Sequence, residues 1–200
     1  MLLKGECARN GVTRVLAKLC TSLLRYTKEI RADKAFLDAG EANRREGINN
    51  MAFMFFNRYL DLYDAIEDPE GPGITDNTDF EGTDIPSPYD IPLPEKNLIS
   101  NEERDNIRDW VLNMNMDNAT NQSLAKRNCE QCGNEIYEAC LSCPYCRLQW
   151  EPCIISGYPL VRSQAISCKI CSKGAIRDYW NDYIQTTMHC PWCKSMQTPY

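Results

Sequence analysis

Apolar residues recur at helical spacing in three stretches of the first third of the chain. In residues 12–26 they occupy every third or fourth position, which is one face of an amphipathic helix. Residues 33–45 predict a second, shorter helix rich in small residues, with Asp33 as its N-cap and Gly47 ending it. A third helix is predicted to begin near Asn50, to carry an aromatic face and to stop at the glycines and prolines behind it.

The second and third of these helices have compositions that favour close packing. The small residues of "AFLDAGEANRREG" let a neighbour approach, and "AFMFFNRYLDLY" supplies aromatic side chains, which is typical of tetratricopeptide-like repeats. Any other three-helix bundle would fit the same pattern. Three such helices bury little surface alone, so the repeat interpretation makes residues 1–66 the end of a longer solenoid.

Residues 67–99 are predicted to form an acidic, proline-rich strap. Its first 31 residues hold nine acidic residues, one lysine and six prolines, which excludes a helix or a central strand. Four apolar side chains alternate among the prolines, at Ile85, Tyr89, Ile91 and Leu93. An extended segment lying on another surface explains this alternation, and a solvated tether is the alternative.

A connecting helix and loop are predicted over residues 100–127. Ser100 and Glu103 have the spacing of a capping box. The helix behind the box has an apolar side formed by Ile107, Trp110, Val111 and Met114. Residues 115–127 are polar and are expected to be loop.

The charge of the chain lies mainly in the strap. The formal net charge is −6, and residues outside the strap sum to +2. No part has the basic stripe that a phosphate backbone requires, so we expect no nucleic-acid partner. Apolar runs fall short of the roughly 20 residues that cross a bilayer, so we expect no membrane span.

Cysteine spacing predicts metal binding after residue 128. Eight of the twelve cysteines form C-x-x-C pairs, and each pair directs two thiolates at one centre. The start of the chain has no charged-then-apolar signal peptide, which argues against disulfides and for a reducing compartment such as the cytosol. Four sulfur ligands suit Zn²⁺. The predicted ligands of two zinc ions are Cys129, Cys132, Cys143, Cys146, Cys168, Cys171, Cys190 and Cys193.

The two quartets are expected to differ in structure. Residues 129–146 are compact and predict a zinc ribbon, whereas the second quartet encloses a short predicted helix with Trp180 as its core anchor. Consecutive pairs are expected to share each ion. A cross-brace, in which alternate pairs share an ion, uses the same eight residues and stays open.

The remaining cysteines and the single histidine are not needed as ligands. Cys140 could replace a ligand in an alternative register, Cys153 is expected to be a buried thiol, and His189 a surface residue or a neighbour of the ligands. Each centre would have four thiolates and no open position, and the lone histidine lies beside a ligand pair. We therefore expect no catalytic residue.

The stretch "PCIISGYPLV", residues 152–161, predicts two short apolar strands that turn at Ser156 and Gly157. Pro159 would confine the second strand to an edge. Tyr158, beside the turn, is expected to be exposed and available to a partner.

An ordered set of motifs resembles a known family. "DFEGTDIP", "YDIPLP", "IRDWVLNMNMD", "PCIISGYPL" and "AIRDYWNDYI" look like the C-terminal region of the intraflagellar transport protein 172 family, whose members belong to ciliary transport complex B. The resemblance implies tetratricopeptide-like helices in a protein of the cilium or flagellum and the basal body, on the cytoplasmic side. It also implies a role in protein transport and cilium assembly, with other complex B subunits and complex A as partners.

Residues 147–194 also resemble RING/U-box modules of ubiquitin ligases. That resemblance implies contacts to ubiquitin or a conjugating enzyme through Ile155 or Ile170, Trp180, Pro191 and Lys194. The middle Cys/His pair of such modules has no counterpart around "SGYPL", and lysine stands where arginine is common. The predicted partner-binding residues are Ile155, Tyr158, Pro159, Ile170, Trp180, Pro191 and Lys194.

The predicted fold class is mainly α, with tetratricopeptide-like helical repeats, followed by a small α+β zinc-binding domain over residues 128–200. That domain would combine a zinc ribbon with a RING/U-box-like lobe. The predicted function is a non-catalytic structural and protein-interaction module of the intraflagellar transport machinery. The alternative is a module for ubiquitin binding or ubiquitin transfer.

Overall fold

A computed structural model describes residues 2–71, 73–74, 76–116 and 122–200. The chain divides into two compact units. The helical unit is Leu23–Ala125, and the cysteine-rich unit combines the residues up to Ser22 with Lys126–Tyr200. The first residues of the chain therefore group with the last third rather than with the helices that follow them. Among the described helices, none combines the length and apolar character that a membrane span requires.

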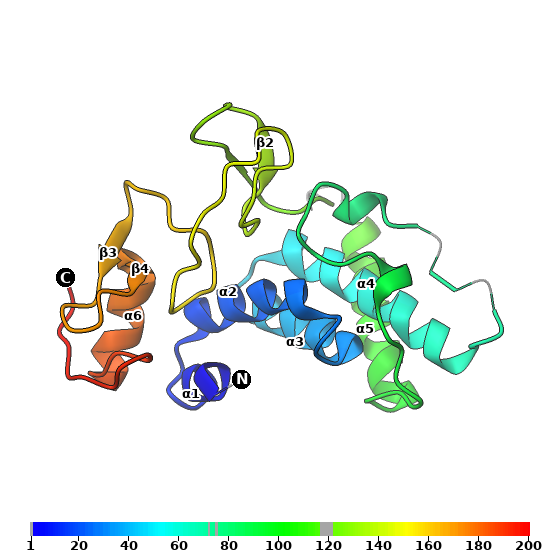
Figure 1. The fold of residues 1–200 in the computed structure, drawn as a ribbon. Helices are drawn as coiled ribbons and strands as arrows, with labels where there is room; N and C mark the ends of the chain where they lie inside the picture. Colours follow the sequence, from blue (N-terminus) through cyan, green and yellow to red (C-terminus); the bar gives the residue numbers. More distant parts are fainter. Residues whose placement is uncertain (1, 72, 75, 117–121) are drawn as a thin grey trace. The chain divides into compact units, whose positions relative to one another are not determined.

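The helical unit is built on a helical hairpin. Helix α3 (Ala32–Arg45) and helix α4 (Asn49–Glu67) lie side by side, joined by a short turn (Figure 1). Gly47 ends α3 as predicted, because it takes the left-handed conformation (φ 73°) that other residues avoid. At Gly40 a Cβ atom would lie 2.5 Å from the ring of Phe56. The small residue is therefore what allows the two helices to approach closely.

Asp33 does not cap α3. The N-cap position is Arg31, which makes no side-chain cap hydrogen bond. The Asp33 carboxylate is buried and accepts two hydrogen bonds from the Arg31 guanidinium, at 2.7 and 2.9 Å. The prediction was wrong because a nearby guanidinium, rather than the backbone N–H groups, is the partner of this carboxylate.

Helix α5 (Asn101–Met116) packs on α4 through an edge-on contact of Trp110 with Phe56, whose ring centroids are 5.4 Å apart. The predicted capping box is present: the Ser100 N–H donates to the Glu103 carboxylate at 3.0 Å, and the Glu103 N–H donates to the Ser100 hydroxyl at 3.3 Å. Ile107 and Val111 are buried. Of the predicted loop 115–127, residues 115–116 belong to α5, residues 126–127 belong to a short strand, and residues 117–121 lie outside the described residues.

The described part of the acidic strap packs within the helical unit and is not a free tether. It contains the short 3₁₀ helices η2 (Thr78–Phe80) and η3 (Pro88–Asp90). Phe80 packs edge-on against Phe36, with centroids 5.8 Å apart, and Asp84 pairs with Arg25 at 3.1 Å. Of the four alternating apolar residues, Ile85 and Ile91 are buried, whereas Tyr89 and Leu93 are exposed.

The cysteine-rich unit begins with two helices. The sequence pattern did not reveal α1 (Leu2–Arg9), but it did predict α2 (Thr13–Leu23), which continues into η1 (Leu24–Tyr26). Two antiparallel strand pairs follow at the other end of the chain: β1 (Lys126–Asn128) with β2 (Glu135–Tyr137), and β3 (Ala165–Ser167) with β4 (Gly174–Ile176). Helix α6 (Arg177–Thr187) begins directly after β4.

Residues 152–161 do not form the two strands that were predicted. They form a tight turn closed by one isolated bridge between Pro152 and Pro159. The hydrogen bonds of that bridge come from the flanking residues, with the Cys153 N–H donating to the Tyr158 carbonyl at 2.7 Å and the Leu160 N–H donating to the Glu151 carbonyl at 2.9 Å. Tyr158 is buried, with 5% of its surface exposed. The expectation that Tyr158 is exposed was therefore wrong, because the turn folds its ring inward.

Candidate metal centres

All four C-x-x-C pairs lie on turns of one type, which we call knuckles. In each, the N–H of the residue after the second cysteine donates to the carbonyl of the first cysteine, as at Gly133 to Cys129 (3.0 Å) and Lys194 to Cys190 (3.0 Å). That residue always has a positive φ: Gly133 (73°), Arg147 (62°), Ser172 (57°) and Lys194 (59°). Only one of the four is glycine, so the other three have adopted a backbone conformation that costs free energy.

Consecutive pairs come together, so two separate four-sulfur clusters form. The first consists of Cys129, Cys132, Cys143 and Cys146, and the second of Cys168, Cys171, Cys190 and Cys193. Within each cluster the ligand atoms lie within 4.8 Å of one another. The clusters do not follow the cross-brace alternative, because no cluster mixes the first and third pairs.

The sulfur spacing fits a tetrahedral ion. Cys129 and Cys146 sulfurs are 3.6 Å apart, and those of Cys168 and Cys193 are 3.8 Å apart. A tetrahedron with Zn–S bonds of about 2.3 Å has edges of about 3.8 Å. Four soft thiolate donors at this spacing are the donor set that Zn²⁺ prefers in closed structural sites.

Thiolate formation is favoured at several ligands by backbone N–H groups. The N–H of Cys132 donates to Cys129 and lowers the pKa of that thiol. The Ser195 hydroxyl and N–H lower the pKa of Cys193 to about 6. Burial opposes this at Cys190 and raises the pKa of that thiol to about 12. Metal ligation by cysteine requires the thiolate, so a cation that binds would displace protons from these clusters.

The first cluster packs against Trp150, together with Ile136 and the partly buried Leu148. The Arg127 guanidinium lies over the Trp150 ring, 3.9 Å from its centroid, and donates to the carbonyls of Glu138 and Cys140 at 3.1 and 2.9 Å. The Trp150 indole donates to the Glu130 carboxylate at 2.9 Å. A cation and a tryptophan thus complete the small core around these sulfurs.

The second cluster is supported by α6, as the sequence predicted. Trp180 is completely buried, and its indole donates to the carbonyl of Thr198 at 3.4 Å. Tyr183 is also buried, and its hydroxyl donates to the Glu6 carboxylate of α1 at 2.8 Å. Helix α6 therefore connects this cluster to the first helix of the same unit.

The remaining cysteines and the histidine lie outside both clusters. Cys140 is buried, and its thiol lies 3.0 Å from the Ser142 carbonyl. Cys153 is a buried thiol, as predicted. His189 is exposed, with its Nδ1 atom 2.8 Å from the Thr187 carbonyl oxygen.

Four of the seven predicted partner-binding residues are buried: Ile155, Tyr158, Pro159 and Trp180. By contrast, Ile170 (68% exposed) and Lys194 lie on the surface, and Pro191 is half-buried. Trp192, which the sequence analysis did not single out, is 65% exposed. Its position in "CPWC" was the available signal, because the two residues between paired cysteines form the tip of a knuckle.

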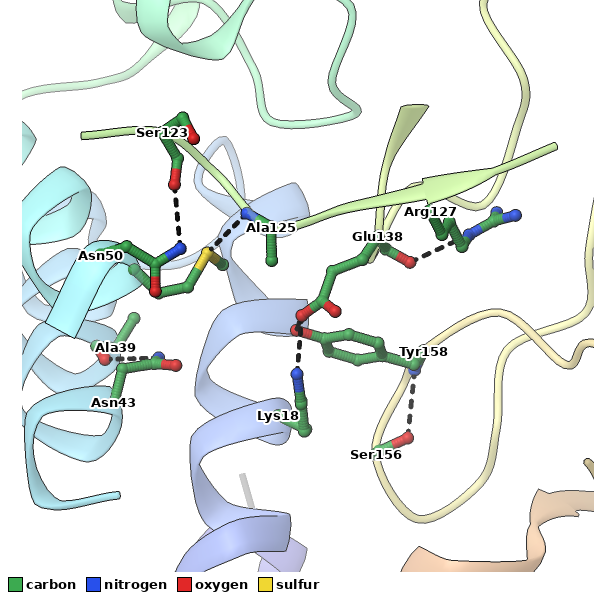
Figure 2. Close-up of polar contacts among 11 residues, drawn as sticks. Lys18, Ala39, Asn43, Asn50, Ser123, Ala125, Arg127, Glu138, Ser156 and Tyr158 are labelled. Carbon is green, nitrogen blue, oxygen red and sulfur yellow. Dashed lines mark hydrogen bonds and ion pairs between the residues drawn. The ribbon is translucent and has the colours of Figure 1, made fainter. Parts of the chain in front are cut away.

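A partly buried polar cluster that the sequence did not reveal joins α2 to the cysteine-rich segments. Figure 2 shows the Glu138 carboxylate between the Lys18 ammonium (2.6 Å) and the Tyr158 hydroxyl (3.0 Å). The ammonium also lies 4.8 Å from the centroid of the Tyr158 ring. Burial, followed by the Glu138 charge, raises the pKa of Tyr158 well above its ordinary value, so its hydroxyl remains a donor.

No family model matches the chain, but it resembles several intraflagellar transport proteins. It is 40% identical over 181 residues to intraflagellar transport protein 172 of Chlamydomonas reinhardtii, a match that covers 88% of this chain and 10% of that protein. It is 41% identical over 184 residues to the Homo sapiens homolog, covering 91% of this chain and 10% of that protein.

A more distant match points to the same proteins. Intraflagellar transport protein osm-1 of Caenorhabditis elegans is 33% identical over 177 residues, covering 86% of this chain and 9% of that protein. The chain thus spans about a tenth of the length of the relatives it matches.

Proposed function

Because the chain is homologous to a segment of intraflagellar transport protein 172, we propose that it is a non-catalytic interaction module of the intraflagellar transport machinery. It would act in the cilium and at the basal body, as part of a complex B subunit. The homology over about nine-tenths of the chain carries this proposal. The helical hairpin of α3 and α4 is consistent with the end of a tetratricopeptide-like repeat array.

Two zinc ions would hold the cysteine-rich unit in shape. Each four-sulfur cluster would bind one ion, since its donor set and its sulfur spacing fit tetrahedral Zn²⁺. An ion with four thiolates has no open position for water or substrate. The metal would therefore supply folding free energy, and the chain's own residues would supply the contact with a partner.

The contact surface would be the exposed tips of the second cluster's knuckles. Ile170 and Trp192 lie at those tips and are two of the most exposed large apolar side chains of the unit. Trp192 also lines a pocket of about 460 Å³ together with Pro191, Ile154 and Leu3. An exposed tryptophan beside an apolar pocket is the kind of feature that carries much of the free energy of protein association.

The charge around these tips indicates what would bind there. Lys169, Lys173 and Lys194 are all exposed, and the Lys173 ammonium lies 5.2 Å from the Trp192 ring centroid. The occupant we propose is an acidic segment with an apolar side chain, supplied by another complex B subunit. The lysines would meet the acidic residues, and the pocket beside Trp192 would take the apolar group.

A binding experiment with isolated complexes tests this surface. Trp192→Ala should weaken capture of complex B by about 30-fold, which corresponds to a hot spot of about 2 kcal/mol. Rising salt should weaken capture by the unmodified chain. The matched control is Tyr145→Ala, because Tyr145 (66% exposed) occupies the equivalent tip of the first cluster. Unchanged capture by Trp192→Ala, or equal loss with Tyr145→Ala, would overturn the surface.

Other partners at this surface would give different results. Capture of complex A but not complex B would place the contact with a different partner. A RING/U-box-like role would be supported by autoubiquitination with a conjugating enzyme that Pro191→Ala abolishes. The exposed Ile170 would be available for such a contact, but the complete burial of Trp180 does not favour that role, since Trp180 would also have to contact the enzyme.

A further inference from the structure

The turn at residues 152–160 has the backbone of a knuckle although it has only one cysteine. In the second knuckle of each cluster, the first cysteine N–H donates to the carbonyl five residues on, as from Cys143 to Leu148 (2.8 Å) and from Cys190 to Ser195 (2.9 Å). Cys153 donates to Tyr158 in the same way, at 2.7 Å.

The remaining backbone features of this turn also match. Gly157 donates to the Cys153 carbonyl at 2.8 Å and has a positive φ of 71°. The flanking bridge of Pro152 with Pro159 has the register of the bridges Ser142–Gln149 and His189–Met196. Aligned on these bonds, Cys153 occupies the place of the first cysteine and Ser156 the place of the second.

The side-chain atoms at these two places accept the same hydrogen bonds as paired cysteines. The Ser156 N–H donates to the Cys153 sulfur at 3.5 Å, as the second-cysteine N–H does in the four other knuckles. The Tyr158 N–H donates to the Ser156 hydroxyl at 3.3 Å. Leu148 and Ser195 make the equivalent bond to Cys146 and Cys193.

Backbone, rather than a second pair of thiols, faces this knuckle. The Ile176 N–H donates to the Cys153 sulfur at 3.2 Å, and the Ile154 N–H donates to the Gly174 carbonyl at 3.1 Å. A Cβ atom on Gly174 would lie 2.4 Å from the Leu160 side chain, so a larger residue at this position of β4 would require that side chain to move. The sulfur of Cys153 is therefore closed in by N–H donors, which satisfy it without a cation.

We propose that residues 152–160 form a fifth knuckle that is held by hydrogen bonds and binds no metal. It connects parts of the cysteine-rich unit that the two clusters do not join. Its Tyr158 reaches Glu138 of the first cluster's segment and Lys18 of α2, while its backbone contacts β4 beside the second cluster. The inference depends on the proposed metal sites only for its contrast: the other four knuckles would hold zinc, and this one would not.

Counting metal in variants of the full chain tests the proposal. Cys153→Ser keeps an acceptor at this position and should retain the zinc content of the unmodified chain. The matched variant Cys143→Ser should lose one ion per chain. Loss of an ion by a folded Cys153→Ser variant, judged by far-ultraviolet circular dichroism, would overturn the proposal.

Ser156→Cys provides a second test should Cys153→Ser fail to fold. It restores a C-x-x-C pair, but β4 offers no facing thiols, so zinc and cadmium titrations should show no third ion. A stoichiometric third ion would overturn the proposal.

Amide exchange separates this inference from the proposed metal centres. If the unmodified chain is found to contain no zinc, the proposed metal centres are refuted. The fifth knuckle would still stand if Gly157 and Leu160 remained protected in that metal-free chain, and it would fall if they exchanged as fast as an unfolded peptide.

Discussion

The helical unit and the cysteine-rich unit are built from different sources of stability. The helical unit buries large aromatic side chains from α3 and α4, among them Phe36, Phe55, Phe56, Tyr59 and Tyr63. The cysteine-rich unit has strands of only three residues, and two-stranded pairs of this size are marginal in water. The comparison indicates that long helices can bury a core of their own. A region whose strands are only three residues long needs another source of stability, which here would be the two zinc ions.

Apolar burial is not absent from the cysteine-rich unit, but it is concentrated beside the sulfurs. Trp150 packs on the first cluster, while Trp180 and Tyr183 of α6 support the second. Trp150 also contacts Arg127, and the Trp180 ring packs edge-on against the ring of Tyr200, with centroids 6.2 Å apart. Because this small core lies beside the sulfurs, we expect it to depend on the bound ions, and metal removal is therefore the most direct way to separate the two units.

Removal of metal should have the largest effect. Chelation under reducing conditions should abolish amide protection around both clusters and leave α3 and α4 protected, because zinc binding at structural sites supplies about 10–16 kcal/mol of folding free energy. Hydrogen exchange followed by mass spectrometry measures both regions in one chain. Simultaneous loss of protection in α3 and α4 would show that the units are not independent.

A single ligand substitution should reproduce part of that effect. Cys190→Ser should unfold the second cluster and release one ion, whereas Cys140→Ser should not, because Cys140 is equally buried but lies outside both clusters. Elemental analysis and proteolysis of both variants measure the difference. Equal zinc loss from the two variants would contradict the assignment of the ligands.

Truncation of the aromatic core should affect the other unit. Phe56→Ala should lower the free energy of unfolding of the helical unit by about 3–5 kcal/mol, because Phe56 is buried between Gly40 and Trp110. Tyr89→Ala, at an exposed position, is the control. Urea denaturation measures the change, and zinc content should stay constant; a fall in zinc would mean that the units share their stability.

Overpacking the helical hairpin should have a smaller effect. Gly40→Ala should destabilise the helical unit by about 1–3 kcal/mol, because its methyl group would meet the buried Phe56 ring. Gly5→Ala in α1 should have the opposite effect and raise the free energy of unfolding of the cysteine-rich unit by about 0.5–1 kcal/mol. The nearest contact of the added Cβ atom would be the Arg9 side chain, at an ordinary distance of 3.5 Å. Denaturation curves of the two variants that shift in the same direction would refute the close-contact explanation.

Loss of the capping box should be the smallest of these changes. Ser100→Ala removes the hydroxyl that accepts the Glu103 N–H and should destabilise the helical unit by about 1 kcal/mol. Ser163→Ala, at an exposed position, is the control. A thermal midpoint equal to that of the unmodified chain would show that tertiary contacts, rather than the cap, position α5.

Local patterns predicted the elements whose signals lie within a few residues. The capping box at Ser100, the end of α3 at Gly47 and the apolar face of α2 each depend on neighbours in sequence. Asp33 was assigned the wrong role, since the position of its partner Arg31 depends on side-chain geometry that spacing does not specify. Tyr158 was predicted to be exposed for the same reason, because the turn type decides which way its ring points.

By itself, the sequence determined which cysteines can form pairs, which stretches of the helical unit form its main helices, and to which proteins the chain is related. Ligand spacing, helical periodicity and ordered motifs are all written in short stretches of residues. Only the tertiary structure decided that consecutive pairs share a cluster, that α1 and α2 group with the last third of the chain, and that Lys18, Glu138 and Tyr158 meet. The grouping of α1 and α2 with the last third, and the contact of Lys18 with Glu138, join residues more than a hundred positions apart. The free energy of all these features depends on packing that no local pattern specifies.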